Sequence, residues 1–364
     1  MISNRYFNHS INKFQKSNNI KIDNYCDIDS IYQNPEYQQC SIINQIADYN
    51  LFGDKYTHYD IINNYNPNTP SLLPTYLFTY TDLTTNQMIY NKINNLFKSN
   101  QKIWILKPRN DYGRHGVTIV KSIKDILHFI KKEGLKGNVV SLWILQKYVE
   151  NPLLLDGLKF HFRIYTLLNI KSNQEIEIYL YKKGFIYTAG QPYNKYSNDL
   201  TSHLSGEDNP NRVIVFSPIH PLFKKVFPSM IELVKENIIP VLPYVTCPND
   251  SGNCFKFLGL DVLIDENYQL YLAEINARLI SLKYPPPGFK DGFYRDILNI
   301  VILNKKPKNM IKVFNYKKYN KKNVIIEGFT SCTPCLMKYL YIIVFILILT
   351  VFLIYIKRMI FNSA

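Results

Sequence analysis

Three oxygen-bearing side chains interrupt two neighbouring apolar stretches in the last third of the sequence. Asp261 lies in one stretch, and Glu274 and Asn276 lie in the next. A hairpin that turns near Asn267 would place Asp261 across from Glu274, and residues two apart on a strand share a face. Two carboxylates and an amide oxygen suit Mg²⁺, which takes one or two carboxylates together with phosphate oxygens. The pattern predicts a metal site, and the alternative is the polar edge of a half-exposed hairpin.

Cationic side chains alternate along another predicted strand. Lys159, His161 and Arg163 occupy every second position, so they share one face. Phe160 and Phe162 then point to the opposite face, toward a core. Three potential cations on one face are unfavourable unless an anion lies there, and a triphosphate would supply that anion. The alternative is a strand face open to water.

A lysine ends a third apolar run. Lys107 follows that run and precedes a loop that contains Gly113 and Gly116. The lysine could reach a phosphate, and the backbone N–H groups of a glycine-containing loop could cover it. The spacing is not that of a P-loop, because no Gly-Lys-Ser/Thr follows. A tight turn without a ligand is the alternative.

Taken in order, these segments resemble the motifs of tubulin–tyrosine ligase-like enzymes, which belong to the ATP-grasp superfamily. The resemblance covers about residues 44–302 and is carried by Lys107-Pro108, Gln146-Lys147-Tyr148, Lys159-Phe160-x-Phe162-Arg163, and Leu258-Gly259-x-Asp261 followed by Glu274-x-Asn276. It implies an ATP-grasp fold with the nucleotide between two lobes, and ATP and Mg²⁺ as cofactors.

The resemblance also implies roles for individual residues. It implies catalytic roles for Arg163, near the transferring phosphate, and for Lys159, on the phosphates. It implies Mg²⁺ on Asp261, Glu274 and Asn276. The nucleotide site that it implies comprises Lys107, Gly113, Gly116, Gln146, Lys147, Tyr148, Val149 and Lys159.

The chain departs from the family pattern on the substrate side. His161 stands where the family usually has Asp, and Tyr187 stands where it has Arg. The family's His-Leu-Thr-Asn corresponds to Asp199-Leu200-Thr201-Ser202. We therefore expect an intact nucleotide and metal apparatus beside an altered substrate pocket, which includes His161, Tyr187, Thr201 and Ser202.

The resemblance implies an ATP-dependent carboxylate–amine ligase. Such an enzyme activates a carboxylate as an acyl phosphate and joins it to an amine, here by adding an amino acid to a protein side chain or terminus. An acidic protein tail such as that of tubulin is one candidate acceptor, and an amino acid is the co-substrate. The alternatives are a catalytically silent ATP-binding scaffold and a ligase that acts on a non-tubulin or small-molecule substrate.

Apolar runs of strand length alternate with helix-like periodicity, which indicates a mixed α/β (α+β) fold. We expect a polar extension with little independent structure at 1–40, the catalytic region at 41–304, a basic linker at 305–338, a membrane-spanning helix at 339–356 and a short tail at 357–364.

The C-terminal part predicts a membrane anchor. Residues 339–356 form an 18-residue run without charge, which at 1.5 Å per residue spans about 27 Å. Lysines precede this run and few residues follow it, so we expect a single-pass tail anchor with the catalytic part facing the cytoplasm. The basic linker would contact anionic lipid, and the alternative is a solvated linker.

The net charge of +15 is concentrated at this end of the chain. From Lys305 onward, ten lysines and Arg358 stand against Glu327, which gives +10. Because the excess is local, we expect no nucleic-acid partner. Six cysteines in a chain of 364 residues do not suggest a disulfide framework. We therefore expect reduced thiols; a zinc site at Cys247 and Cys254 is the alternative.

Overall fold

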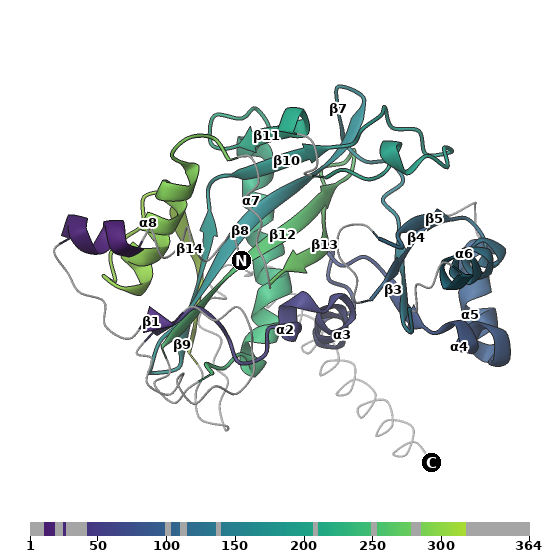
Figure 1. Cartoon of the computed structure of the whole chain (residues 1–364), viewed down its shortest axis with the longest axis horizontal. Helices are drawn as coiled ribbons and strands as arrows, with labels where there is room; N and C mark the ends of the chain where they lie inside the picture. The colour runs from purple at the N-terminus through teal and green to yellow at the C-terminus, as the bar shows by residue number, and fades with distance from the viewer. Residues whose placement is uncertain are drawn as a thin grey trace, which may run out of the picture. The chain divides into compact units, whose positions relative to one another are not determined.

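The computed structural model describes residues 11–18, 25–26, 42–98, 103–109, 115–135, 140–206, 210–248, 253–277 and 285–317. Within these residues the strands form a large sheet and a small sheet of four strands (Figure 1). Most neighbouring strands are antiparallel. The described chain therefore has the mixed α/β architecture predicted from the sequence.

The large sheet is built around the long strand β8 (Leu158–Ile170). On one side β8 pairs with β12 (Cys254–Ile264), and on the other side it pairs first with β10 and then with β9. The other members are β1 (Tyr25–Cys26), β2 (Ile42–Ile43), β7 (Leu154–Leu155), β9 (Glu175–Tyr181), β10 (Gly184–Thr188), β11 (Val213–Phe216), β13 (Leu270–Asn276) and β14 (Met310–Lys317).

Both faces of the large sheet are covered, because β8 carries apolar residues on each of them. Phe162 and Ile164 point to one face, where they pack with the apolar side of α7 (Phe223–Ile238). Tyr165 and Leu167 point to the other face, where α8 (Phe289–Val301) supplies Phe293 and its neighbours. The alternation expected for β8 is confirmed, and the second face is a core for part of its length.

The small sheet has the order β3 (Thr75–Phe78), β6 (Trp143–Lys147), β4 (Trp104–Pro108) and β5 (Thr118–Val120). Its apolar residues pack against α4 (Tyr80–Thr85), α5 (Gln87–Lys98) and α6 (Ile123–Leu135). Ile123, Ile126 and Ile130 recur at helical spacing and are buried, which explains how α6 packs on the sheet. This packing holds β4 in place, together with Lys107 near its end.

The remaining described elements are a helix at 11–18, α2 (Asn50–Gly53), α3 (Lys55–Tyr65) and the 3₁₀ helices η2 (Leu200–Ser202), η3 (Pro210–Arg212) and η4 (Ile239–Tyr244). Asp54 caps α3 by accepting the backbone N–H groups of Tyr56 and Thr57. The same carboxylate forms an ion pair with Arg109 at 2.8 Å. The start of α3 is thereby fixed to the end of β4.

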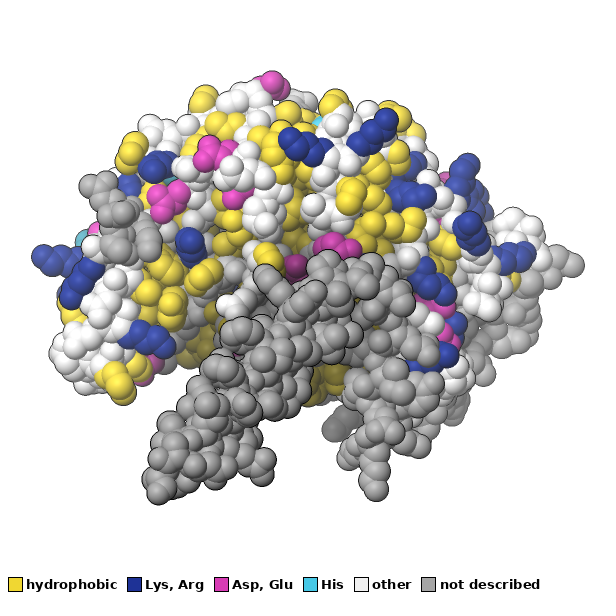
Figure 2. All heavy atoms as spheres, turned by 180° about the vertical axis from the view of Figure 1, so that it is seen from behind, with side chains coloured by type: hydrophobic (Ala, Val, Ile, Leu, Met, Phe, Trp, Pro, Cys, Tyr) yellow, Lys and Arg dark blue, Asp and Glu magenta, His cyan; other side chains and the backbone are white. Residues whose placement is uncertain are grey.

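Seen from behind, the molecule carries Lys and Arg side chains in several separate groups, with Asp and Glu between some of them (Figure 2). Apolar side chains reach the surface between these groups. The described part of this face therefore offers no single large basic surface.

Two features of the structure differ from the sequence predictions. Met310–Lys317, within the expected basic linker, is strand β14 and pairs with β9, so the sheet continues past residue 304. Cys247 and Cys254 form a disulfide, so the expectation of reduced thiols is wrong for this pair. Cys247 follows η4 and Cys254 is the first residue of β12, so the fold brings the two cysteines together.

The predicted membrane segment at 339–356 and most of the basic residues before it lie outside the described residues. Among the residues that are described, no helix combines the length and the apolar character needed to cross a bilayer.

Candidate functional site

Three charged residues form a row across three adjacent strands of the large sheet. Asp261 on β12 is paired with Arg163 on β8 on one side and with Glu274 on β13 on the other. Residues paired across antiparallel strands point to the same face. The predicted opposition of Asp261 and Glu274 is confirmed, and Arg163 joins them.

Arg163 neutralises Asp261 directly. Its guanidinium donates two hydrogen bonds to the carboxylate, one from Nε to Oδ1 and one from Nη2 to Oδ2 at 2.9 Å. Asn276 donates a further bond from Nδ2 to Oδ2 at 3.2 Å. Burial opposes ionisation of Asp261, but Arg163 and then His161 outweigh it and hold the pKa of Asp261 below its usual value. Asp261 is therefore a buried, ionised carboxylate whose two oxygens both accept hydrogen bonds.

Glu274 has a different environment. Its side chain is 34% exposed, and Lys55 at the start of α3 lies 3.8 Å away. A β-bulge after Asp261 shifts the hairpin register by one residue, so the pairs nearer the turn differ from those at the site. Glu274 thus has oxygen lone pairs that are open to a ligand from the water side.

The donor set was tested for a fit to Mg²⁺. In the described chain no three His, Cys, Asp or Glu side chains converge as metal ligands. Glu274 and the amide oxygen of Asn276 fit a magnesium ion shared with phosphate oxygens. Asp261 would join them only by giving up hydrogen bonds from Arg163 and Asn276. The assignment of all three as metal ligands remains a prediction.

His161 lies beside the row. Its Nε2 is 3.6 Å from Oδ1 of Asp261, and its Nδ1 shares a hydrogen bond of 2.6 Å with Oγ of Ser205. Its ring also contacts Tyr187, with centroids 5.3 Å apart. Tyr187 is completely buried and lies under the guanidinium of Arg163 at 5.8 Å. Two of the four residues predicted for the substrate pocket therefore meet next to Asp261.

The other two residues of that prediction lie in η2. Thr201 donates from Oγ1 to Asp199 at 2.7 Å, and Ser202 donates from Oγ to the carbonyl of Asp199 at 2.8 Å. The backbone of Gly190 donates to the carbonyl of Thr201, so this turn lies alongside the end of β10. These contacts shape the turn, and no contact links Thr201 or Ser202 to the charged row among the described residues.

Lys159 is buried against aromatic rings. Its Nζ lies 3.7 Å from the ring centroid of Tyr148 and 5.9 Å from that of Tyr193. Within the described parts of the chain it forms no ion pair with a carboxylate. Burial lowers the pKa of Lys159 to about 7. A buried cation held only by ring faces is well prepared to receive an anion.

Tyr148 is positioned in turn by the long loop after β10. Its hydroxyl shares a hydrogen bond of 2.8 Å with Nδ1 of His203, and Nε2 of His203 bonds the carbonyl of Ser197 at 3.0 Å. Tyr193 adds its ring to Lys159 and donates its hydroxyl to the carbonyl of Glu150 at 2.7 Å. The segment at 189–206 thus packs against the chain that follows β6 of the small sheet.

Lys107 reaches the site from the small sheet. Its Nζ donates to Oε1 of Gln146 at 3.0 Å, and Nε2 of Gln146 donates to Thr75 at 3.1 Å. Burial lowers the pKa of Lys107 to about 8, while the charge of Glu274 acts in the opposite direction. That electrostatic interaction links Lys107 to the row on the large sheet.

The other predicted nucleotide residues fall into three groups. Tyr148 and Val149 are buried, whereas Lys147 is exposed at the end of β6. Gly116 has a φ of 65°, and a Cβ there would lie 2.8 Å from the ring of Pro108, so the position requires glycine. Both the phosphate-loop prediction and the tight-turn alternative are compatible with this requirement. Gly113 lies outside the described residues.

Five residues complete the cluster although the sequence did not single them out: Lys55, Thr75, Tyr193, His203 and Ser205. Three of them, Tyr193, His203 and Ser205, come from residues 189–206, between β10 and β11.

Comparison with known proteins gives a consistent result. The profile of the tubulin-tyrosine ligase family matches residues 10–209 and 222–310. A probable beta-tubulin polyglutamylase of Tetrahymena thermophila is 26% identical over 286 residues, covering 67% of this chain and 23% of that protein. A probable tubulin polyglutamylase, ttll-9, of Caenorhabditis elegans is 27% identical over 198 residues, covering 49% and 46%.

The human tubulin polyglutamylase TTLL7 is 26% identical over 243 residues, which cover 57% of this chain and 25% of the human protein. The similarity therefore spans less than half the length of each of these three relatives. The family profile, in contrast, covers most of the present sequence and contains every residue of the charged row. This chain belongs to the tubulin-tyrosine ligase family.

Proposed function

We propose that this chain is an ATP-dependent ligase that joins an amino acid to a protein. The observation that carries the proposal is that buried basic side chains from two sheets lie around the charged row: Lys159 shares the strand face of Arg163, and Lys107 interacts electrostatically with Glu274. Lys107 comes from β4, and Lys159 and Arg163 come from β8. Lys159 has no carboxylate partner in the described structure, and burial favours its neutral form unless an anion binds.

In the proposed reaction the γ-phosphoryl group of ATP passes to a carboxylate oxygen, and ADP leaves. The amine nitrogen then attacks the acyl carbon, phosphate departs with the oxygen, and the amine loses a proton as the amide bond forms. Lys107 and Lys159 would hold phosphate oxygens, and Arg163 would face the transferring group. Mg²⁺ on Glu274 and Asn276, with Asp261 predicted as a further ligand, would supply additional positive charge to the phosphates.

The substrates are a further part of the proposal. The relatives named above are tubulin polyglutamylases or probable ones, which makes glutamate and an acidic protein tail such as that of tubulin the first substrates to test. His161 and Tyr187 differ from the family pattern and lie beside Asp261 and Arg163. We propose that these two residues alter the choice of amino acid or acceptor.

One observation favours a second candidate, a catalytically silent ATP-binding scaffold. Both oxygens of Asp261 accept hydrogen bonds from Arg163, and Asn276 adds a third. A ligase with Asp261 on the metal needs these hydrogen bonds to open when Mg-ATP binds, whereas a scaffold does not.

Incubation of the whole chain with ATP, Mg²⁺, radiolabelled amino acids and acidic tail peptides tests the proposal. We expect label in the peptide and release of ADP in equal amount. ATP binding without label transfer to any carboxylate acceptor would support the scaffold, and no ATP binding would contradict both candidates.

We also propose that residues 339–356 anchor the chain in a membrane with the described part on the cytoplasmic side. The support is the uncharged 18-residue run and the lysines that precede it. Deletion of Tyr339–Ala364 should move the protein from the membrane pellet to the supernatant. Protease added from the cytoplasmic side should degrade the described part, and protection would contradict the orientation.

A further inference from the structure

A basic hollow lies between the end of α8 and strands β9 and β14, away from the charged row. It has a volume of about 470 Å³, and Tyr179 lies in its wall. Five lysines line it: Lys182, Lys305, Lys306, Lys308 and Lys312. We call this site the lysine hollow.

The carboxylates nearest to the lysine hollow are already used by other groups. Glu177 accepts a hydrogen bond from Lys312, lies 3.0 Å from Lys171, and accepts the hydroxyl of Tyr179 at 3.0 Å. Asp296 accepts the backbone N–H groups of Lys308 at 3.0 Å and of Asn309 at 2.7 Å. Both carboxylates are buried, so neither is available to the other lysine side chains.

The remaining cations have no described acidic partner. Within residues 285–317 and the other described ranges, Lys182, Lys305, Lys306 and Lys308 form no ion pair, and the last three are exposed. Four cations around one concave surface repel one another, and this repulsion is relieved when an anion binds. The lysine hollow therefore carries an excess of positive charge that an anion would neutralise.

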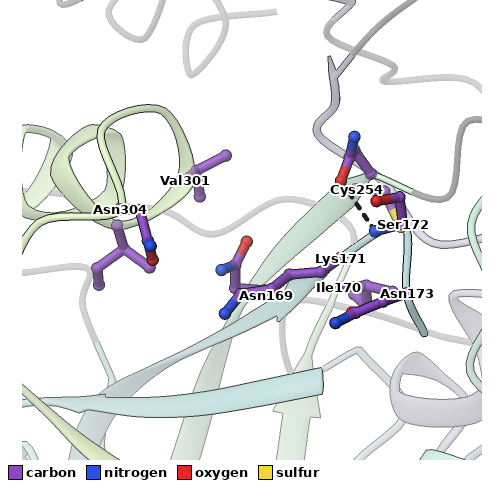
Figure 3. Close-up of a pocket in the computed structure, with 10 residues that line it drawn as sticks. Asn169, Ile170, Lys171, Ser172, Asn173, Cys254, Val301 and Asn304 are labelled. Carbon is purple, nitrogen blue, oxygen red and sulfur yellow. Dashed lines mark hydrogen bonds between the residues drawn. The ribbon is translucent and has the colours of Figure 1, made fainter. Parts of the chain in front are cut away.

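A second hollow adjoins it and has a different character. It has a volume of about 360 Å³ and shares Ile300 and Asn304 with the lysine hollow. Figure 3 shows Asn304, at the end of α8, and Asn169 and Asn173, from the strand side, around this space. Amide groups offer neutral hydrogen bonds that suit hydroxyl or carbonyl groups beside an anion.

The course of the chain favours a membrane as the source of that anion. Strand β14 ends at Lys317, and the uncharged run begins at Tyr339. The 21 residues between them can span at most about 75 Å when fully extended. This inference rests on the membrane anchor proposed above: a bilayer that holds residues 339–356 lies within the length of chain that leads to the lysine hollow. An acidic polypeptide would have no comparable tether.

We propose that the lysine hollow is a docking site for the phosphate-bearing headgroup of an anionic membrane phospholipid. The large apolar side chains that are most exposed in the described structure, such as Ile219 and Met88, do not line this hollow. The contact is therefore electrostatic and lies at the headgroup level, without insertion into the hydrocarbon. Such a contact weakens as salt shortens the range of the charges.

Hydrogen exchange of the whole chain tests this proposal with two kinds of vesicle. One kind contains phosphatidylcholine alone, and the other contains phosphatidylcholine with one-fifth phosphatidylserine or a small fraction of phosphatidylinositol bisphosphate. The readout is exchange of the backbone N–H groups from Asn304 to Lys312. We expect slower exchange only with the anionic vesicles, and loss of that effect in high salt.

Charge variants of the whole chain give the matched comparison. Lys305→Gln/Lys306→Gln/Lys308→Gln should weaken the anionic-vesicle effect about a hundredfold in lipid concentration, from about fivefold per lysine. Lys124→Gln/Lys131→Gln/Lys132→Gln removes the same charge from exposed positions of α6 and should leave the effect unchanged.

Several outcomes would overturn the proposal. Equal exchange with neutral and anionic vesicles would exclude headgroup docking. Slowing by soluble inositol hexakisphosphate but not by anionic vesicles would identify a free anion as the ligand. Slowing by polyglutamate but not by anionic vesicles would identify the hollow as a protein-binding surface. If both triple variants weakened the effect equally, vesicle binding would depend only on the net charge of the protein and not on the lysine hollow.

Discussion

Arg163 and Asp261 are cross-strand partners on β8 and β12, and the guanidinium donates to both oxygens of the carboxylate. The side chains are 8% and 11% exposed, so each is the main neutralising charge of the other in apolar surroundings. Asp261 thus has a structural role in this chain besides its predicted role on a metal. These two roles can be separated experimentally.

Asp261→Asn should lower the free energy of unfolding by about 3 kcal/mol, because Arg163 stays charged and loses its buried anion. Urea unfolding followed by circular dichroism measures the change. Asp291→Asn removes one carboxylate from an exposed pair with Lys13 and should change stability by less than about 1 kcal/mol. Equal stability of Asp261→Asn and the wild type would show that the buried pair contributes little.

Glu274→Gln should affect metal binding rather than stability. Its side chain is partly exposed and its ion pair with Lys55 is long at 3.8 Å, so stability should change by less than about 1 kcal/mol. The rise in Tm on addition of Mg-ATP should be mostly lost, because a metal ligand has been removed. Glu232→Gln, on the exposed side of α7, serves as the control. A full Mg-dependent shift in Glu274→Gln would place the metal elsewhere.

ATP binding should take up protons. Burial lowers the pKa of Lys159 to about 7 and that of Lys107 to about 8, and a bound phosphate favours the charged forms. Affinity should therefore fall by up to about tenfold per pH unit between pH 7 and 9 for each lysine that must be protonated. Calorimetry in two buffers of different ionisation enthalpy measures the protons. Lys159→Arg, which stays charged, should reduce the uptake.

In the absence of ATP, the same two lysines should make the free energy of unfolding increase with pH, whereas the affinity for ATP decreases with pH. The unfolded chain holds these protons up to the ordinary lysine pKa, whereas the folded chain has released most of them above about pH 7 to 8. The stability of the free protein should consequently rise over this interval. A decline over the same interval would mean that other groups dominate.

His161 and Tyr187 should behave as one unit. Tyr187→Arg alone places a second cation beside Arg163 at a fully buried position, and should destabilise the fold. Adding His161→Asp supplies an anion next to the new cation, so the double variant should be more stable than the sum of the single changes by about 1–3 kcal/mol. Urea unfolding of the four proteins gives this coupling, and additivity would show that the two positions do not interact.

The amino-acid preference of these variants provides the functional test. With His161→Asp, Tyr187→Arg and Ser202→Asn combined, label transfer should shift between amino acids or acceptors, while the Kd for ATP stays within about threefold, or about 0.7 kcal/mol. Retained preference would show that these positions do not select the substrate. A large loss of ATP affinity would assign them to nucleotide binding.

Glu177 should stabilise the fold at neutral pH and lose this stabilising effect at low pH. Burial alone would raise the pKa of Glu177, but hydrogen bonds from Lys312, Lys171 and Asn169 outweigh it and lower the pKa to about 2. This stabilisation is present above the ordinary glutamate pKa and is lost as the pH falls toward about 2. Glu177→Gln should therefore unfold more easily at pH 7, and the difference should vanish near pH 2. A constant difference would contradict the assignment.

The hairpin and the charged strand could be predicted because their signals are local. Alternation places Lys159, His161 and Arg163 on one face, and a short turn fixes Asp261 opposite Glu274. The bulge after Asp261 could not be predicted, because it depends on how the strands fit neighbours that are far away in the sequence. The same holds for β14, whose basic residues resemble those of a linker.

Contacts between distant segments account for the other differences. The pairing of Arg163 with Asp261 depends on the order of strands in the sheet, which no local pattern contains. Tyr148 contacts His203 only because the segment at 189–206 folds back toward the small sheet. The disulfide of Cys247 and Cys254 forms because β12 and η4 bring two thiols together, whereas composition predicted that they stay apart.

The row of Glu274, Asp261 and Arg163 also specifies the register of the strands during folding. If β12 slid by one residue against β8, Asp261 would turn toward the apolar side that packs on α7, and Arg163 would lose its anion. Such a misaligned intermediate would contain two buried charges without ionic partners, and it would therefore be unstable. The residues proposed to bind the metal and the transferring phosphoryl group therefore also favour the native register of the central strands over a shifted one.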